Sequence, residues 1–256
     1  MTTTRAVDAD PQIVRIEGWT ANGYLIVGQK IVVVDPGVPR LVRSMLHYVE
    51  HELKRPASDI SWATVTHYHN DHVGGMGLLQ QISGCQVALP ALARPFVEQG
   101  ARIPFPRPLR WLHMLAVHNR QRNPTPTPRD AWQTEKIGLP LISPRPKFDV
   151  HAWLDEGDAL PDAPGFTALF TPGHSADSTC LWHEQSGSLF SGDMLLGNFE
   201  GPPQANAYCL SRTKTIASLQ RLADLPIKRL FPGHGPLHSG EYLAKEAVET
   251  LRTDLV

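Results

Sequence analysis

Four residues with metal-binding side chains fall within six positions, in the run His67-Tyr68-His69-Asn70-Asp71-His72. The residues before them, 62–66, read as a strand with the sequence WATVT. On extended backbone, side chains two positions apart point the same way, so His67 and His69 can converge on one ion. Asp71 and His72 follow where the chain turns towards a helix, and they can face a second ion. The fold must therefore bring this strand end to an edge that other ligands can reach.

Three further residues of the same kind follow predicted strands later in the chain. His174 lies in TPGHS, Asp193 in SGD and His234 in PGHG. Each has a glycine beside it, and glycine lets the backbone turn sharply and approach an ion closely. Imidazole and carboxylate groups are the ligands expected for zinc. Together with the first run, these residues predict one shared metal site.

The rest of the chain alternates between strand and helix patterns, which predicts an α/β protein with helices flanking sheets. No linker rich in glycine or serine divides residues 1–256, so we expect a single domain. The predicted strands are 13–18, 23–27, 30–34, 62–66, 85–90, 151–158, 166–170, 178–184, 188–193 and 228–233. The predicted helices are 40–55, 76–82, 91–100, 107–121, 211–224 and 241–255.

A proline-rich stretch at about 104–148 breaks this rhythm. A long irregular connection within a compact domain is usually a functional loop or lid. We therefore expect an insert that covers the site and differs with the substrate. Phe105, Trp111, Trp132 and the later Phe199 are candidates to line an apolar pocket, although ordinary packing explains each of them individually better.

Composition limits the partners of the chain. The formal net charge is -1, so the basic excess typical of proteins that bind nucleic acid or anionic membranes is missing. No apolar run is long enough to span a bilayer, and three widely spaced cysteines favour a reduced, cytoplasmic setting. We expect a small-molecule substrate, no nucleic acid and no membrane partner, and we leave a homo-oligomer open.

The motifs HxHxDH, TPGH, GD and PGHG, preceded by VDPG at 34–37, resemble those of the metallo-β-lactamase superfamily. Within it they are similar to the glyoxalase II-like and lactonase-like hydrolases, from about Ile13 to the C-terminal helix. The resemblance implies a four-layer αββα sandwich with the site at one edge. It also implies that Asp193 bridges two ions and that Asp35 supports the site without binding metal. The remaining implied ligands are His67, His69 and His174 for one ion, and Asp71, His72 and His234 for the other.

The same resemblance implies a hydrolase with two zinc ions per chain, although iron or manganese also fits. A metal-bridging hydroxide would attack the carbonyl of an ester, thioester or lactone. Asp71 would carry a proton to the leaving group. Tyr208 has two interpretations: it donates a hydrogen bond to the substrate, or it is a packed surface residue. Asp193 favours these hydrolases over true β-lactamases. The alternatives are β-lactamase-like or phosphodiester hydrolysis at the same site, and a mononuclear iron persulfide dioxygenase.

The other histidines that we considered lack partners at ligand spacing, and we interpret them as non-ligands. They are His113, His118, His151, His183 and His238.

Overall fold

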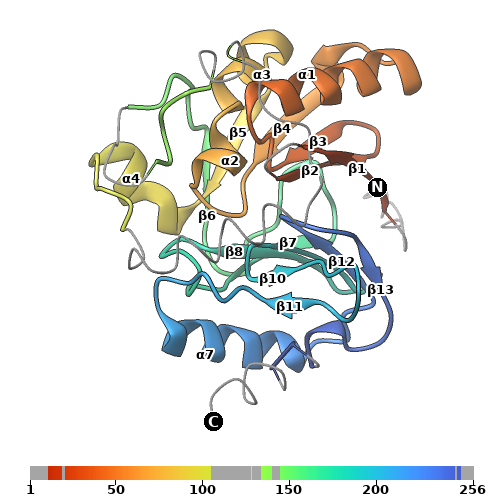
Figure 1. Cartoon of the computed structure of the whole chain (residues 1–256). Helices are drawn as coiled ribbons and strands as arrows, with labels where there is room; N and C mark the ends of the chain where they lie inside the picture. The colour runs from red at the N-terminus through yellow and green to blue at the C-terminus, as the bar shows by residue number, and fades with distance from the viewer. Residues whose placement is uncertain are drawn as a thin grey trace, which may run out of the picture.

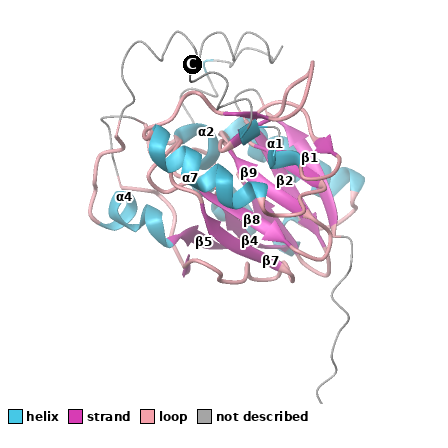
Figure 2. Ribbon diagram, turned by 90° about the horizontal axis from the view of Figure 1, so that it is seen from below, coloured by secondary structure: helices cyan, strands magenta, loops and turns pink. Residues whose placement is uncertain are grey.

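The computed structural model describes residues 11–18, 21–104, 128, 134–139, 145–245 and 247–248. Two sheets lie face to face, with helices α1 and α3 outside the first sheet and α7 outside the second (Figure 1). The resulting order of layers is helix, sheet, sheet, helix, which is the order that the family resemblance implied. Figure 2 shows α7 lying across the outer face of its sheet.

The first sheet has the strand order β1-β2-β3-β4-β5-β6. β1 to β3 are antiparallel, and β3 to β6 run parallel. Its strands are β1 (Gln12–Glu17), β2 (Asn22–Val27), β3 (Ile31–Val34), β4 (Ile60–Thr64), β5 (Gln86–Pro90) and β6 (Ala152–Leu154). The helices of this half are α1 (Pro39–His47), α2 (Asn70–Val73), α3 (Met76–Ser83) and α4 (Arg94–Glu98).

The second sheet has the order β13-β12-β9-β8-β7. Its strands are β7 (Phe166–Phe170), β8 (Thr179–His183), β9 (Ser188–Gly192), β12 (Arg229–Pro232) and β13 (His238–Ser239). A separate two-stranded ribbon pairs β10 (Leu195–Leu196) with β11 (Gln204–Ala205). Helix α7 (Arg212–Ala223) begins at Ser211, whose side chain accepts a hydrogen bond from the backbone N–H of Lys214.

The alternation of side chains along each strand produces the layers. In β3, Ile31 and Val33 pack towards the helices, whereas Val32 and Val34 pack towards the second sheet. All four are fully buried, which explains the unbroken apolar run IVVV. Each sheet therefore has two buried faces, and the apolar helix faces cover the outer ones.

The second sheet repeats this arrangement. Leu181 of β8 faces the first sheet, whereas its neighbours Cys180 and Trp182 pack with Leu219 and Leu222 of α7. The two sheets are also joined at one edge. There the Tyr24 hydroxyl donates to the carbonyl of Pro232 at 2.5 Å, a bond that links β2 to the end of β12.

Local structure departs from the predictions in a few places. The helix expected at 40–55 is α-helical only to His47 and continues as a π-helical turn, Tyr48–Glu52. The helix expected at 91–100 is a 3₁₀ turn, Ala91–Ala93, followed by α4. Pro95 lies in the first turn of α4, where its missing N–H costs nothing. The sequence pattern did not reveal β10, β11 or β13, which are only two residues long.

Most of the predicted insert at 104–148, including the helix expected at 107–121 and the side chains of Phe105, Trp111 and Trp132, lies outside the described residues. Both the lid and the single-domain organisation remain predictions. Among the described residues, no helix combines the length and the apolar character that a membrane span requires.

Candidate metal centre

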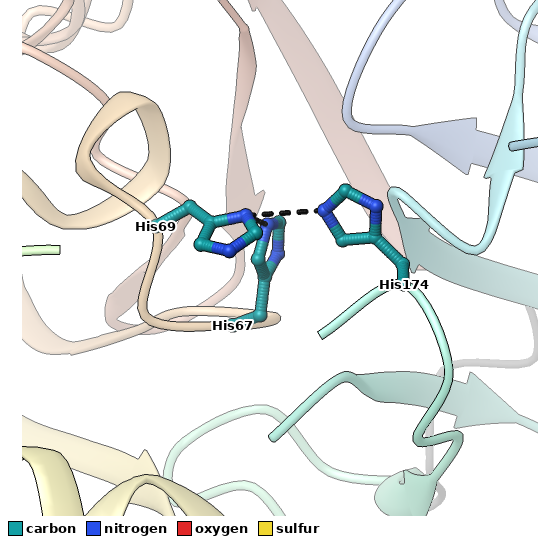
Figure 3. A group of neighbouring side chains, drawn as sticks. All are labelled: His67, His69 and His174. Carbon is teal, nitrogen blue, oxygen red and sulfur yellow. Dashed lines mark hydrogen bonds between the residues drawn. The ribbon is translucent and has the colours of Figure 1, made fainter. Parts of the chain in front are cut away.

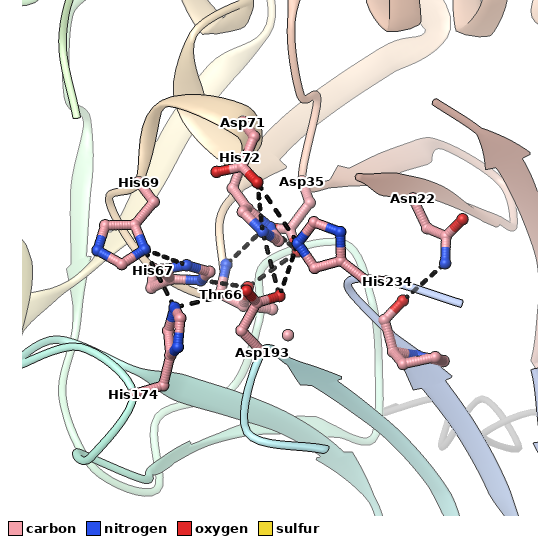
Figure 4. Close-up of polar contacts among 12 residues, drawn as sticks. Asn22, Asp35, Thr66, His67, His69, Asp71, His72, His174, Asp193 and His234 are labelled. Carbon is pink, nitrogen blue, oxygen red and sulfur yellow. Dashed lines mark hydrogen bonds and ion pairs between the residues drawn. The ribbon is translucent and has the colours of Figure 1, made fainter. Parts of the chain in front are cut away.

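The predicted ligands come together because the strands that carry them end at the same edge. β3 and β4 are parallel, so Asp35 and the run that starts at His67 follow neighbouring strand ends. In the second sheet, β9 and β12 are parallel, and β7 points the same way because β8 is antiparallel to both β7 and β9. His174, Asp193 and His234 follow these three strands. Figure 4 shows the loops from both sheets converging on one cluster.

Three imidazoles form the first group of candidate ligands (Figure 3). Nδ1 of His69 lies 3.0 Å from Nε2 of His67 and 3.1 Å from Nε2 of His174. Nitrogens held 2.0–2.1 Å from one zinc ion at tetrahedral angles would be roughly 3.3 Å apart. The spacing of the three nitrogens therefore fits a single ion of that size.

Asp71, His72 and His234 form a second group. Oδ2 of Asp71 lies 3.4 Å from Nε2 of His234 and 3.9 Å from Nε2 of His72. Asp193 stands between the groups, because its Oδ1 is 3.3 Å from Nε2 of His72 and 3.2 Å from Nε2 of His234. Its Oδ2 is 3.4 Å from Nε2 of His174 in the first group. One carboxylate thus offers an oxygen to each group (Figure 4).

Two atoms of the cluster lack the partners that burial demands. Within the part of the chain that the structure describes, Nδ1 of His72 is buried 3.0 Å from Oδ2 of Asp35 without hydrogen-bond geometry. On the side of the cluster, neither Nε2 of His72 nor Oδ1 of Asp193 has a hydrogen-bond partner, and both are buried. An unpaired buried polar atom is costly, and a cation between these atoms would satisfy both. The donor set and these two atoms therefore fit divalent metal ions.

Gly233 allows this close approach. A Cβ at that position would lie 2.4 Å from Oδ1 of Asp193 and 2.7 Å from Cε1 of His72. Any larger residue would push one of these two groups away. Steric contact with Asp193 and His72 therefore explains why a glycine stands beside the predicted ligand His234.

Asp35 holds two ligand-bearing elements from behind the cluster. Its Oδ1 accepts from the backbone N–H of Thr66 at 2.7 Å, and its Oδ2 accepts from the Thr66 hydroxyl at 2.9 Å. Oδ2 also lies 3.0 Å from Nδ1 of His72, the ring nitrogen that points away from the cluster. A carboxylate at this position favours a proton on Nδ1 and leaves Nε2 free to bind a metal. The geometry matches the supporting position implied for Asp35.

His174 is oriented by the loop before α7. Its Nδ1 lies 2.7 Å from the backbone carbonyl of Tyr208 and 3.1 Å from Nδ2 of Asn206. Oδ1 of Asn206 also accepts from the backbone N–H of Tyr208 at 2.9 Å. The Tyr208 ring is half-buried, with its centroid 5.9 Å from that of His174. Tyr208 therefore lies at the rim of the cluster.

The pKa values of the histidines in the cluster shift in opposite directions. Burial, together with neighbouring imidazoles, lowers the pKa of His69 to about 3 and keeps the pKa of His67 well below its ordinary value. Burial also disfavours charge on His234, but Asp193 and Asp71 outweigh it and raise its pKa to about 10. Burial likewise raises the pKa of Asp71, but His72 and His234 outweigh it and hold that pKa well below its usual range. Two ionised carboxylates thus face the place where a cation would lie.

The sequence as a whole matches one known family. A family model described as the metallo-beta-lactamase superfamily matches residues 16–234. The chain belongs to the metallo-beta-lactamase superfamily. The match includes every predicted ligand, and it accounts for the sandwich of two sheets with the cluster at one edge.

Two curated relatives cover most of the chain. The chain is 25% identical over 236 residues to the "Beta-lactamase-like protein 2 homolog" of Caenorhabditis elegans, covering 91% of this chain but only 61% of that protein. It is 27% identical over 244 residues to the "Acyl-coenzyme A thioesterase MBLAC2" of Gallus gallus, covering 90% of this chain and 78% of that protein. The family match and these relatives support an enzyme, a hydrolase of the metal-dependent kind.

One solved structure that is similar to this chain contains metal ions. The crystal structure of TTHA1623 in a di-iron-bound form is 28% identical to this chain, with a TM-score of 0.55, and covers 90% of this chain and 94% of that one. The cluster of histidines and aspartates here suits divalent ions in general. Zinc therefore remains one candidate among several ions.

The structure brings all seven predicted ligands into one cluster and places Tyr208 beside it. The described histidines that were interpreted as non-ligands have other neighbours. His151 accepts from the backbone N–H of Val87, His238 accepts from that of Asn198, and the buried His183 lies against Ser186. His113 and His118 lie outside the described residues. Phe199 is 68% exposed, so it is not a packed residue.

Sequence reasoning missed the polar residues that hold the ligands in place. Asn206 and Thr66 contact ligand histidines directly. Asp177, which is buried, accepts from the backbone N–H of Tyr68 at 2.7 Å, between two ligands of the first group. The only available sign of their role was the occurrence of small polar residues within loops that also carry ligands.

Proposed function

We propose that this chain is a binuclear metal-dependent hydrolase of carbonyl compounds, with a thioester as its preferred substrate. The observation that carries the binuclear site is the position of Asp193, whose two oxygens face different ligand groups. The relative described as an acyl-coenzyme A thioesterase, which matches over 90% of this chain, supports the thioester.

The proposed ligand sets divide the cluster. His67, His69 and His174 would hold one ion, Asp71, His72 and His234 would hold the other, and Asp193 would contact both. When bound, two divalent ions supply a hydroxide nucleophile near neutral pH and a Lewis acid for a carbonyl oxygen. Asp71 and Asp193 bring only two negative charges to this site. The protein therefore leaves room for an anionic group or a developing oxyanion.

Asp71 is the residue best placed to move a proton. Its side chain is one-third exposed, so the carboxylate borders both the cluster and the entrance from solvent. Its lowered pKa keeps it ionised at neutral pH, so it could hold the proton that a water gives up when it becomes the hydroxide nucleophile. It would then pass this proton to the sulfur of the leaving thiolate.

Tyr208 would orient the substrate. Burial and the charge of Asp71 raise the pKa of its phenol, so the hydroxyl keeps its proton at neutral pH. A neutral hydroxyl can donate a hydrogen bond to a carbonyl oxygen, and that bond strengthens as the oxygen gains negative charge. Tyr208 would therefore contribute more in the transition state than in the bound substrate.

A substrate panel together with metal analysis tests the proposal. The purified chain should contain two metal ions and should hydrolyse an acyl thioester faster than an ester, a lactone, a β-lactam or a phosphodiester. Asp71→Asn should retain some metal but lose most of the turnover rate. The control Asp162→Asn, an exposed residue before the start of β7, should not change the rate. The control substitution removes one negative charge, as Asp71→Asn does. Asp162 precedes β7, however, whereas the cluster lies beyond the opposite end of that strand.

Three results would contradict the proposal. Hydrolysis of only a β-lactam or a phosphodiester would reject the carbonyl ester class. One iron ion per chain with oxygen consumption would favour the persulfide dioxygenase. Full turnover in Asp71→Asn would remove Asp71 from proton transfer.

A further inference from the structure

The residue between two proposed ligands of different groups points its side chain away from the cluster. Asn70 follows His69 and precedes Asp71, and its Nδ2 donates to the backbone carbonyls of Glu135 at 2.6 Å and Ile137 at 2.7 Å. Its backbone N–H donates to the carbonyl of Gly138 at 3.1 Å. Three hydrogen bonds therefore join the ligand-bearing run His67–His72, here called the ligand loop, to a segment more than sixty residues later in the chain.

The same segment touches the ligand loop backbone to backbone. Gly138 has a φ of +67°, and a Cβ built there would lie 2.4 Å from the carbonyl oxygen of Tyr68. It would also lie 2.6 Å from the backbone nitrogen of Asn70 and 2.8 Å from the carbonyl carbon of His69. No side chain fits there unless the ligand loop moves.

This segment also contacts residues outside the run His67–His72 that carries the ligands. Ile137 is 1% exposed and belongs to the core between the first sheet and its helices. The backbone N–H of Glu135 donates to the carbonyl of Gly74 at 3.1 Å, and its Oε2 accepts from the backbone N–H of Lys147 at 3.0 Å. A segment fixed to the core in this way can act as a firm support.

The ligand loop needs such a support because strand pairing does not reach it. β4 ends at Thr64, and the ladder to β5 includes only Trp62 and Ala63. His69 precedes α2 and Asp71 lies in its first turn, both beyond the last paired residue of β4, and both side chains enter the cluster (Figure 4). Their direction is therefore set by contacts outside the sheet.

We propose that residues 134–139 are a positioning element of the metal centre, which sets the direction of His69 and Asp71 through Asn70 and Gly138. The inference rests on the proposed binuclear site. Because His69 belongs to one group and Asp71 to the other, displacement of this loop should weaken the binding of both ions. Loss of a single ligand such as His234 should mainly weaken one.

Gly138→Ala and a matched control test the proposal. Gly84 has a φ of +73°, and no atom lies within 4 Å of the place that a Cβ would occupy, so Gly84→Ala introduces the same backbone strain without a contact. Metal-free protein would be titrated with Co²⁺, and the visible absorption of bound cobalt and the two binding constants would be measured. Gly138→Ala should weaken both constants by about 10- to 100-fold, as for other outer-sphere changes at metal sites. Gly84→Ala should bind cobalt as the wild-type chain does.

Asn70→Ala provides the second variant and decides alone if Gly138→Ala does not fold. It should also weaken both constants and change the cobalt spectrum, whereas Asn198→Ala, which removes the acceptor for the backbone N–H of Glu200, should not. Wild-type cobalt binding in Asn70→Ala and in folded Gly138→Ala, or weakening of only one ion, would overturn the inference. A wild-type chain that binds no cobalt would instead reject the proposed function itself.

Discussion

The Asp35→Asn substitution should weaken metal binding at His72 while the chain remains folded. Asp35 is 1% exposed, and each of its oxygens has a defined neighbour. Asparagine has almost the same shape and tolerates the left-handed backbone that Asp35 adopts, with a φ of 54°. The substitution therefore changes hydrogen bonding and charge while leaving the packing almost intact.

The orientation of the new amide follows from its neighbours. The backbone N–H of Thr66, now 2.7 Å from Oδ1, requires an acceptor, so the amide oxygen must face it. The amide NH₂ then replaces Oδ2, which lies 3.0 Å from Nδ1 of His72. His72 must accept there and carry its proton on Nε2, the atom that faces Asp71, Asp193 and the proposed ion. Metal binding then requires the histidine to exchange its tautomer or to lose this hydrogen bond.

We expect the affinity for the ion at His72 to fall by about 10- to 100-fold, the usual effect of such outer partners. This corresponds to about 1.4–2.7 kcal/mol of binding free energy. Competition with a chelator of known zinc affinity measures the change. Asp162→Asn is the control, since Asp162 has a φ of 55° but is exposed. Unchanged zinc affinity in Asp35→Asn would refute the orienting role of Asp35.

Three further predictions concern the cluster. Asp193→Ala should bind fewer than two ions per chain by elemental analysis, because the carboxylate faces both groups; two tightly held ions would contradict the bridging position. Tyr208→Phe should keep its metal but lose about tenfold in kcat, the loss of about 1.4 kcal/mol of transition-state stabilisation; unchanged kcat and KM would remove it from the site. Metal-free protein should be most stable near pH 6.5 in denaturant titrations. The pKa of His234 is raised to about 10 in the folded chain, against about 6.5 in the unfolded chain. Protonated His234 therefore stabilises the fold fully below about pH 6.5, and this contribution is lost as the pH rises to about 10. The pKa of His69 is lowered to about 3 in the folded chain. As the pH falls below about 6.5, His69 becomes protonated only in the unfolded chain, so the fold is destabilised. Stability that stays flat between these limits would contradict both shifts.

Patterns within the chain were sufficient to predict most of the fold. The apolar run at 31–34 predicted a strand, and the alternation of strands and helices predicted helices flanking sheets, whereas the four-layer order was implied by the family resemblance. These features are local, because side-chain periodicity depends only on the geometry of one element. The π-helical turn after His47 and the two-residue strands escaped prediction because each is too short to produce a recognisable periodicity of side chains.

The sequence by itself also determined which residues form the cluster. Each ligand type follows a strand, and strands that run in one direction end at one edge, so the run from His67 to His72 could be joined to His174, Asp193 and His234. Only the tertiary structure decided how they face one another. The two oxygens of Asp193 lie between the groups because loops from both sheets meet there. The contact of Asn70 and Gly138 joins residues 68 positions apart, and no local pattern encodes a contact at that separation.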